Sequence, residues 1–165
     1  WVERDEIIDG SAIAPGDVAV GLASSGLHTN GYSLARRALA GERLTGEHPA
    51  LGRPLGEALL EPHRSYLPGV ERLRSRVRIT GLPEGVSVRL DPASWPVPPL
   101  FRLIQRLGGV AEAEMYRVFN MGVGMVAFVA RGDAPAALEL AGPEAWSIGE
   151  AVPHDRQGVI WPWSD

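Results

Sequence analysis

The chain has 165 residues, of which 45% are hydrophobic, and this is enough for one domain with a sizeable core. The formal net charge of −4 argues against broad binding to nucleic acids or anionic membranes, and the absence of cysteine excludes disulfides and thiolate metal sites. No apolar run approaches the ~20 residues of a transmembrane helix. No secretory leader is visible either, so we expect a cytoplasmic protein.

The pattern of apolar and polar residues predicts strands and helices in alternation. A helix over 98–107 begins with prolines and is stopped by Gly108 and Gly109. A nearly continuous apolar run over 123–130 predicts a strand that is buried on both faces. The other predicted elements are strands over 17–23, 86–90, 145–151 and 158–161, and helices over 34–40 and 134–141. Such alternation around one core indicates a layered α/β arrangement.

The segment from Gly21 to Ser33 is the most informative part of the chain. It lies between a predicted strand and a predicted helix, and it holds hydroxyls, an imidazole, a carboxamide and glycines. Glycines let a backbone approach a ligand closely, and the first N–H groups of a helix favour an anion such as phosphate. The pattern fits a ligand loop, and equally a capped turn with Asn30 or Ser33 as the helix N-cap.

The same segment, Gly-Leu-Ala-Ser-Ser-Gly-Leu-His-Thr-Asn-Gly-Tyr-Ser, resembles one from the C-terminal half of the aminoimidazole ribonucleotide synthetase family, also called phosphoribosylformylglycinamidine cyclo-ligases. Four further blocks resemble that family in the same order. They cover residues 2–10, 59–66, 95–101 and 114–125. The block over 59–66 reads Leu-Leu-Glu-Pro-His-Arg-Ser-Tyr, where the family element has threonine in place of His63. The resemblance therefore extends over nearly the whole chain.

The resemblance implies a fold and an activity. The fold is α+β, a layered sandwich of a mixed sheet with packed helices, and residues 1–165 form a single substrate-side domain. The activity is the ATP-dependent cyclisation of formylglycinamidine ribonucleotide to aminoimidazole ribonucleotide in purine biosynthesis. The family binds ATP and Mg²⁺ mainly through a preceding domain, which is absent from this chain, and forms a homodimer. We therefore expect the chain alone to be inactive.

The resemblance also implies roles for individual residues. His28 suits proton exchange with the reacting amide, since imidazole titrates near neutrality. Asn30 offers a donor and an acceptor to an amidine or a carboxamide. Both are predicted to be catalytic, and no residue is predicted to bind a metal. The predicted substrate-binding residues are Ser24, Ser25, Gly26, Thr29, Gly31, Thr80, Gly81, Glu114 and Asn120.

The chain departs from the family pattern after Gly81. The family has a His-x-Thr-Gly-Gly-Gly loop followed by a Glu-Asn-x-Pro-Arg stretch, whereas here Thr80-Gly81 runs directly into Leu82-Pro83. We predict that a Gly-rich loop is missing between residues 81 and 82, since such ligand loops are often mobile. A true deletion is the alternative.

Other functions and other residues stay open at this point. A related ATP-dependent enzyme resembling formylglycinamidine synthetase, or a non-catalytic binding module, would also fit parts of the pattern. Arg64 and Arg117 can each pair with phosphate or with a nearby glutamate. The remaining histidines show no ligand spacing and are predicted to lie on the surface, whereas the tryptophans are predicted in a core or an interface. The residues concerned are His48, His63, His154, Trp95, Trp146, Trp161 and Trp163.

Overall fold

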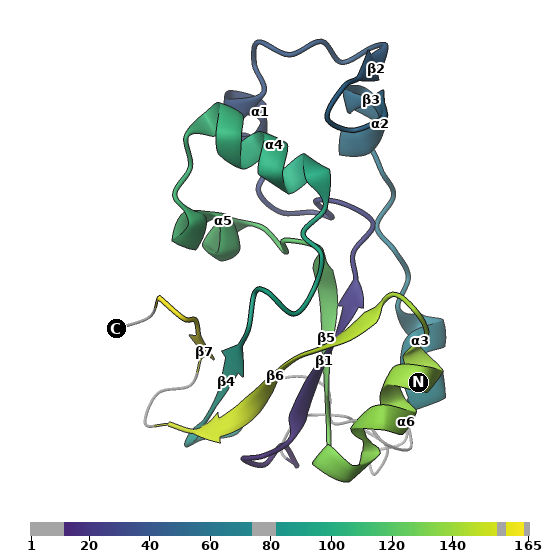
Figure 1. Ribbon diagram of the computed structural model, residues 1–165, viewed down its shortest axis with the longest axis vertical. Helices are drawn as coiled ribbons and strands as arrows, with labels where there is room; N and C mark the ends of the chain where they lie inside the picture. The colour runs from purple at the N-terminus through teal and green to yellow at the C-terminus, as the bar shows by residue number, and fades with distance from the viewer. Residues whose placement is uncertain (1–11, 74–81, 155–157, 164–165) are drawn as a thin grey trace. The chain divides into compact units, whose positions relative to one another are not determined.

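The computed structural model describes residues 12–73, 82–154 and 158–163, which fold into two compact units (Figure 1). Unit 1 comprises Trp1–Leu22, Tyr66–Trp95 and Met125–Asp165, and unit 2 comprises Ala23–Ser65 and Pro96–Gly124. Each unit thus combines segments that are far apart in the sequence. The loop that follows residue 23 belongs to unit 2.

Unit 1 is built on a five-stranded mixed sheet. Its strands are β1 (Val18–Ala23), β4 (Val86–Leu90), β5 (Val123–Val129), β6 (Ala145–Pro153) and β7 (Val159–Ile160), in the order β5-β1-β6-β4-β7. β6 pairs antiparallel with β1 and β4, whereas β7 pairs parallel with β4. Val18 lies opposite Glu150, and the register shifts between Ala19 and Val20. The mixed sheet confirms the α+β fold class.

Two helices pack together beside this sheet, α3 (Leu67–Leu73) and α6 (Ala134–Ala141), as Figure 1 shows. A 3₁₀ turn, η2 (Arg131–Asp133), leads into α6. Alternate side chains of a strand point to one face, so every second residue of β1 joins the same core. That core consists of Val18, Val20, Leu22, Tyr66, Leu73, Ala127, Val129, Ala134 and Ala137.

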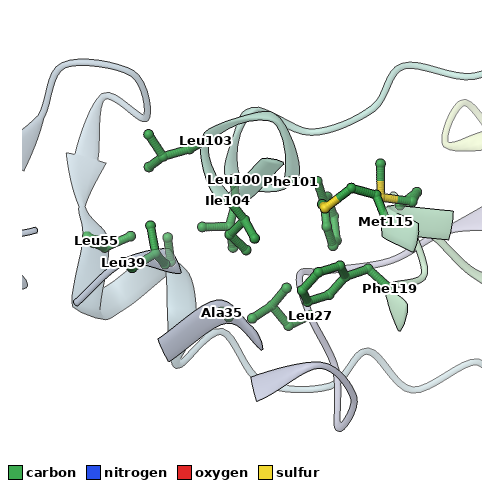
Figure 2. Packing of buried hydrophobic residues seen from close by; sticks show 12 residues of the cluster. Leu27, Ala35, Leu39, Leu55, Leu100, Phe101, Leu103, Ile104, Met115 and Phe119 are labelled. Atoms are coloured by element: carbon green, nitrogen blue, oxygen red, sulfur yellow. The ribbon is translucent and has the colours of Figure 1, made fainter. Parts of the chain in front are cut away.

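Unit 2 is mainly helical. It contains α1 (Tyr32–Ala38), α2 (Leu55–Leu59), α4 (Pro99–Gly108), α5 (Glu112–Val118) and a short antiparallel pair, β2 (Glu47–His48) with β3 (Arg53–Pro54). α4 places its apolar residues three and four positions apart, which makes one buried face. Figure 2 shows the resulting core, which holds Leu27, Ala35, Leu39, Leu55, Ala58, Leu100, Phe101, Leu103, Ile104, Met115, Phe119 and Met121.

The longer predicted elements agree with the structure. β4 and α6 have the predicted bounds, and α4 is shifted by one residue and ends at Gly109 in the left-handed region. β5 is only half-buried over its first four residues and buried over its last three, so the prediction of burial on both faces is right for its end alone. The short elements β2, β3, α2, α3 and α5 were not predicted. Within the described ranges, no helix is long and apolar enough to cross a membrane.

Of the four tryptophans predicted to lie in a core or an interface, one is confirmed in the core, and an interface stays a prediction for the other three. Trp95 is buried. Trp146, Trp161 and Trp163 are half-buried, and the rings of Trp161 and Trp163 stack with their centroids 5.5 Å apart. Large aromatic side chains of this kind contribute most of their apolar area to a core or a covered surface.

Candidate functional site

Asn120 organises the loop between β1 and α1, which is the segment that the sequence singles out. Its Oδ1 accepts hydrogen bonds from the Ser24 hydroxyl at 3.0 Å and from the Gly122 N–H at 2.9 Å. Its Nδ2 donates to the Gly26 carbonyl at 2.8 Å. The Ser24 N–H also donates to the Gly122 carbonyl at 2.8 Å. One carboxamide therefore joins the start of the loop to the turn that precedes β5.

The turn at Asn120 needs an unusual backbone. Met121 and Gly122 both have positive φ, 49° and 104°. A Cβ added at Gly122 would lie 2.5 Å from Cδ of Pro98, which is closer than real Cβ contacts come. Glycine is therefore required there for conformation and for space. This tight turn fixes the position from which Asn120 reaches the loop.

Ser25 fastens the loop to a second segment, the residues that follow α2. Its hydroxyl donates to the Pro62 carbonyl at 2.6 Å and accepts from the Arg64 N–H at 3.2 Å. Its own N–H donates to Nε2 of His28 at 3.3 Å. Because residues 62 and 64 are both held by Ser25, the residue between them, His63, is brought against the loop.

His28 and His63 form a stacked pair of imidazoles. Their ring centroids are 3.9 Å apart and their planes differ by 16°. His28 is half-buried and has a left-handed backbone with φ of 57°. Burial lowers the pKa of His28 below its ordinary value of 6.5, and His63 and Arg64 lower it further by their charge. Since Nε2 accepts a hydrogen bond, the neutral ring carries its proton on Nδ1.

The loop ends at Gly31, which caps α1 through its backbone. Gly31 has φ of 79°, and no side chain caps the helix. The interpretation of Asn30 or Ser33 as a side-chain N-cap is therefore wrong. A Cβ at Gly31 would overlap the ring of Phe119, so the glycine allows close packing here. Thr29 and Asn30 are exposed, and their side chains are accessible to a ligand.

Glu114 pairs with Arg117 on α5. The two carboxylate oxygens of Glu114 accept from Nε and Nη2 of Arg117, each at 2.6 Å. This hydrogen bonding lowers the pKa of the Glu114 carboxyl. Glu61 pairs instead with Arg53, with 2.6 Å between Oε2 and Nη1. Of the two arginines whose partner the sequence left open, Arg117 therefore pairs with Glu114, whereas the glutamate near Arg64 is engaged by Arg53.

The structure therefore brings several predicted residues together and adds others. Ser24 and Gly26 are both hydrogen-bonded to Asn120, and Ser25 is hydrogen-bonded to His28. Thr80 and Gly81 lie outside the described residues. The sequence analysis missed the placement of His63, predicted only to be a surface histidine. Its one signal was its position inside the block over 59–66. Among the residues that the structure describes, no group of three or more His, Cys, Asp or Glu side chains is placed to hold a metal ion.

The chain matches a known protein family over most of its length. The family described as "AIR synthase related protein, C-terminal domain" matches residues 14–82 and 81–162. A phosphoribosylformylglycinamidine cyclo-ligase of Anaeromyxobacter sp. (strain Fw109-5) is 49% identical over 170 aligned positions, which cover 90% of this chain and 49% of that protein. The cyclo-ligase of Paraburkholderia phymatum is 44% identical over 95% of this chain and 49% of its own length. The chain thus spans about half the length of these curated relatives.

Solved structures support the fold. The crystal structure of Escherichia coli HypE, a hydrogenase maturation protein, superimposes with a TM-score of 0.54 at 22% identity, covering 92% of this chain and 48% of that one. HypE in a HypE–HypF complex gives a TM-score of 0.50 at 17% identity, over 94% of this chain and 53% of that one. At such low identity the similarity concerns the arrangement of helices and strands.

Proposed function

The chain belongs to the AIR synthase related protein family, in which it is the C-terminal domain, and from this membership we propose that it is the substrate-side part of an ATP-dependent cyclo-ligase. The reaction closes the imidazole ring of formylglycinamidine ribonucleotide and yields aminoimidazole ribonucleotide, ADP and phosphate. The observation that carries this proposal is the 49% identity, over 90% of the chain, to a relative named phosphoribosylformylglycinamidine cyclo-ligase.

His28 is proposed to donate a hydrogen bond to the reacting amide. Its Nε2 is occupied by the Ser25 N–H, which leaves the Nδ1–H as the donor of the neutral ring. A neutral imidazole does not give up its N–H proton near pH 7, so this Nδ1–H acts as a hydrogen-bond donor to charge that develops on the amide, and one such positioned donor typically contributes ~10²–10³ in rate. The lowered pKa of His28 keeps this neutral form populated.

The exposed loop residues are proposed to contact the substrate. Asn30 offers its carboxamide to the amidine, and Thr29 offers a hydroxyl. Gly31 makes room for the ring of Phe119 and Gly26 is buried beside Glu61 and Ala58, so both are proposed to shape the loop that meets the ligand. Ser24 and Ser25 already bond within the protein, so their proposed contribution to binding is to hold this loop in shape. Thr80, Gly81 and Glu114 complete the proposed substrate-binding set.

Asn120, in the turn before β5, is proposed to support the loop between β1 and α1 that contacts the substrate. Its carboxamide uses Oδ1 and Nδ2 on loop and turn atoms, so its role in binding depends on the loop geometry that it maintains. A site whose supporting side chains are fixed by hydrogen bonds keeps its reactive groups in place.

ATP and Mg²⁺ are proposed ligands of the half of the protein that precedes this domain. ATP supplies the phosphoryl group that activates the formyl-amide oxygen for ring closure. The described residues of this chain hold no acidic cluster for the metal, which supports the assignment of Mg²⁺ to the other half. We also propose that the full-length protein is a cytoplasmic homodimer, as the family resemblance implies.

The test is an assay of the full-length protein with formylglycinamidine ribonucleotide, ATP and Mg²⁺. We expect aminoimidazole ribonucleotide and phosphate to form in equal amounts. Hydrolysis of ATP without ring closure would instead favour a related ATP-dependent enzyme. Calorimetry on the 165-residue chain alone should show weak binding of ATP–Mg²⁺ and weak but measurable binding of a ribose 5-phosphate analogue. Tight ATP binding by this chain would contradict the division of labour between the two halves.

A further inference from the structure

The stacked imidazoles of His28 and His63 come from two different segments of unit 2. His28 lies in the loop before α1, and His63 follows α2. The hydroxyl of Ser25 holds the segment of His63 from both sides, through the Pro62 carbonyl at 2.6 Å and the Arg64 N–H at 3.2 Å. The backbone that carries His63 is therefore held on both sides of that residue.

The His28 ring is held on its edge and on its face. Its edge accepts the Ser25 N–H at Nε2, 3.3 Å away. Its face lies against His63 with 3.9 Å between centroids and 16° between planes. The stacked ring limits the tilt of the imidazole about that hydrogen bond, so the two contacts together orient the Nδ1–H.

The charged groups around His28 lower its pKa and so favour the neutral ring. The groups that lower its pKa by charge are His63 and Arg64, both from the segment after α2. Glu61, the carboxylate of that segment, is engaged by Arg53 with 2.6 Å between Oε2 and Nη1. Two positively charged rings at stacking distance repel each other, and protonation of Nε2 would also break the bond from the Ser25 N–H.

We propose that His63 is a positioning residue for His28: its stacked ring fixes the plane of the His28 imidazole. This inference rests on the proposed function, since the Nδ1–H that His63 orients is the donor to the reacting amide. His63 itself does not touch the substrate in this role. It is an exposed residue, and its replacement is compatible with an intact core.

Two substitutions separate the role of a flat ring at position 63 from the role of its ionisable group. His63→Thr removes the stacked ring and its charge, and threonine is the residue of the family element over 59–66. His63→Phe keeps a flat ring without an ionisable group. His154→Thr, an exposed histidine of unit 1, is the matched control. Nuclear magnetic resonance of the imidazole protons follows the titration of His28 in each variant. The dependence of kcat and KM on pH is measured in the full-length protein.

We expect His63→Thr to raise the pH midpoint of the His28 titration, because a covering ring and a repelling charge are both lost. The kcat plateau should fall roughly 10-fold with little change in KM, since misplacement of a donor acts mainly on the transition state. His63→Phe should restore most of this plateau. His154→Thr should change neither measurement.

An unchanged His28 midpoint in His63→Thr would overturn the inference, whatever the activity. A plateau that His63→Phe fails to restore would overturn the orienting role of the ring. The proposed function fails by a different result, which is the absence of ring closure in the wild-type protein while the midpoint still shifts in His63→Thr.

Discussion

The carboxamide of Asn120 donates to the carbonyl of Gly26 across 2.8 Å, although 94 positions separate the two residues. The same side chain accepts from Ser24 and Gly122 at 3.0 and 2.9 Å. All three hydrogen bonds concern groups that would otherwise need water or another partner. The geometry of the loop between β1 and α1 is therefore tied to one side chain outside it.

Asn120→Ala should loosen the loop and lower the stability of unit 2. The substitution removes three hydrogen bonds, each worth about 1 kcal/mol net, and leaves Ser24 and the Gly26 carbonyl without this partner. We expect the free energy of unfolding to fall by about 2–3 kcal/mol, measured by chemical denaturation. Hydrogen exchange should accelerate at the amides of residues 24–28.

Arg117→Ala is the matched control for Asn120→Ala, because it breaks an exposed pair on α5 of the same unit. Exposed ion pairs contribute little to stability, so this variant should unfold nearly as the wild type does. Equal losses of stability in the two variants would contradict the bridging role of Asn120.

Gly31→Ala should destabilise the protein for two separate reasons. Gly31 has φ of 79°, where an alanine costs about 1–2 kcal/mol, and its Cβ would overlap the ring of Phe119. A clash with a packed ring adds about 1–3 kcal/mol. We expect a loss of about 2–5 kcal/mol in thermal or chemical unfolding.

Gly46→Ala separates these two contributions. Gly46 has nearly the same φ, 81°, but a Cβ there would meet nothing within 4 Å. It should therefore show the backbone cost alone. Phe119→Leu combined with Gly31→Ala should recover part of the difference, since the smaller side chain relieves the overlap. A loss for Gly31→Ala no larger than that for Gly46→Ala would show that Phe119 moves aside freely.

The sequence predicted those features that depend on local pattern. β4 and α6 have the predicted bounds because apolar spacing over 86–90 and a proline in the first turn of 134–141 are local signals. The resemblance of residues 21–33 to a family segment indicated the loop that contains His28. The short elements β2 and α2, of two and five residues, were missed because they are too short to show a period of their own.

The contacts that shape the site could not be predicted in this way. Ser24 and Asn120 are 96 positions apart, and their hydrogen bond depends on the chain returning to the loop through the turn at Gly122. His63 has no period or ligand spacing that marks it as a partner of His28. Gly31 stands at the N-cap of α1, where the sequence offered Asn30 or Ser33 as one alternative, and its contact with Phe119 has no local signal in the sequence.

The lowered pKa of His28 predicts a pH dependence of stability. In the unfolded chain His28 has an ordinary pKa of about 6.5, whereas in the folded protein its pKa is lower. As the pH falls below about 6.5, the unfolded chain takes up this proton first, so stability is lost until the folded group is also protonated. The contribution of His28 to the free energy of unfolding is therefore fully present above about pH 6.5.

His28→Asn should abolish that contribution. Denaturation of the wild type and the variant at about pH 7.5 and about pH 5.5 measures it, because the effects of other groups cancel in the comparison. We expect the wild type to lose more stability than the variant between these two pH values. An equal loss would mean that His28 titrates alike in the folded and unfolded chains.

The junction at Gly81 and Leu82 predicts a further segment of the natural protein. The family matches the chain as two stretches, 14–82 and 81–162, which meet at this point. The alignment to the Anaeromyxobacter relative spans 170 positions while covering 90% of the 165 residues here, so the relative has residues that this chain lacks. A peptide map of the natural protein should contain a Gly-rich segment with Asn or Glu between these residues. A peptide that reads directly from Thr80-Gly81 into Leu82-Pro83 would establish a true deletion.

His28→Asn should slow ring closure without unfolding the protein. Asparagine tolerates the left-handed backbone at this position, where φ is 57°, so the loop can keep its course. The variant lacks the imidazole N–H donor, and loss of one positioned donor typically lowers kcat by ~10²–10³. Turnover of formylglycinamidine ribonucleotide with ATP and Mg²⁺ in the full-length protein measures this effect, and the melting temperature of each variant monitors the fold.

His48→Asn is the control, since His48 belongs to the same unit but pairs with Glu42 at 3.2 Å. Its turnover should match that of the wild type. Unchanged turnover in His28→Asn would remove His28 from the reaction and leave it a structural role in the loop.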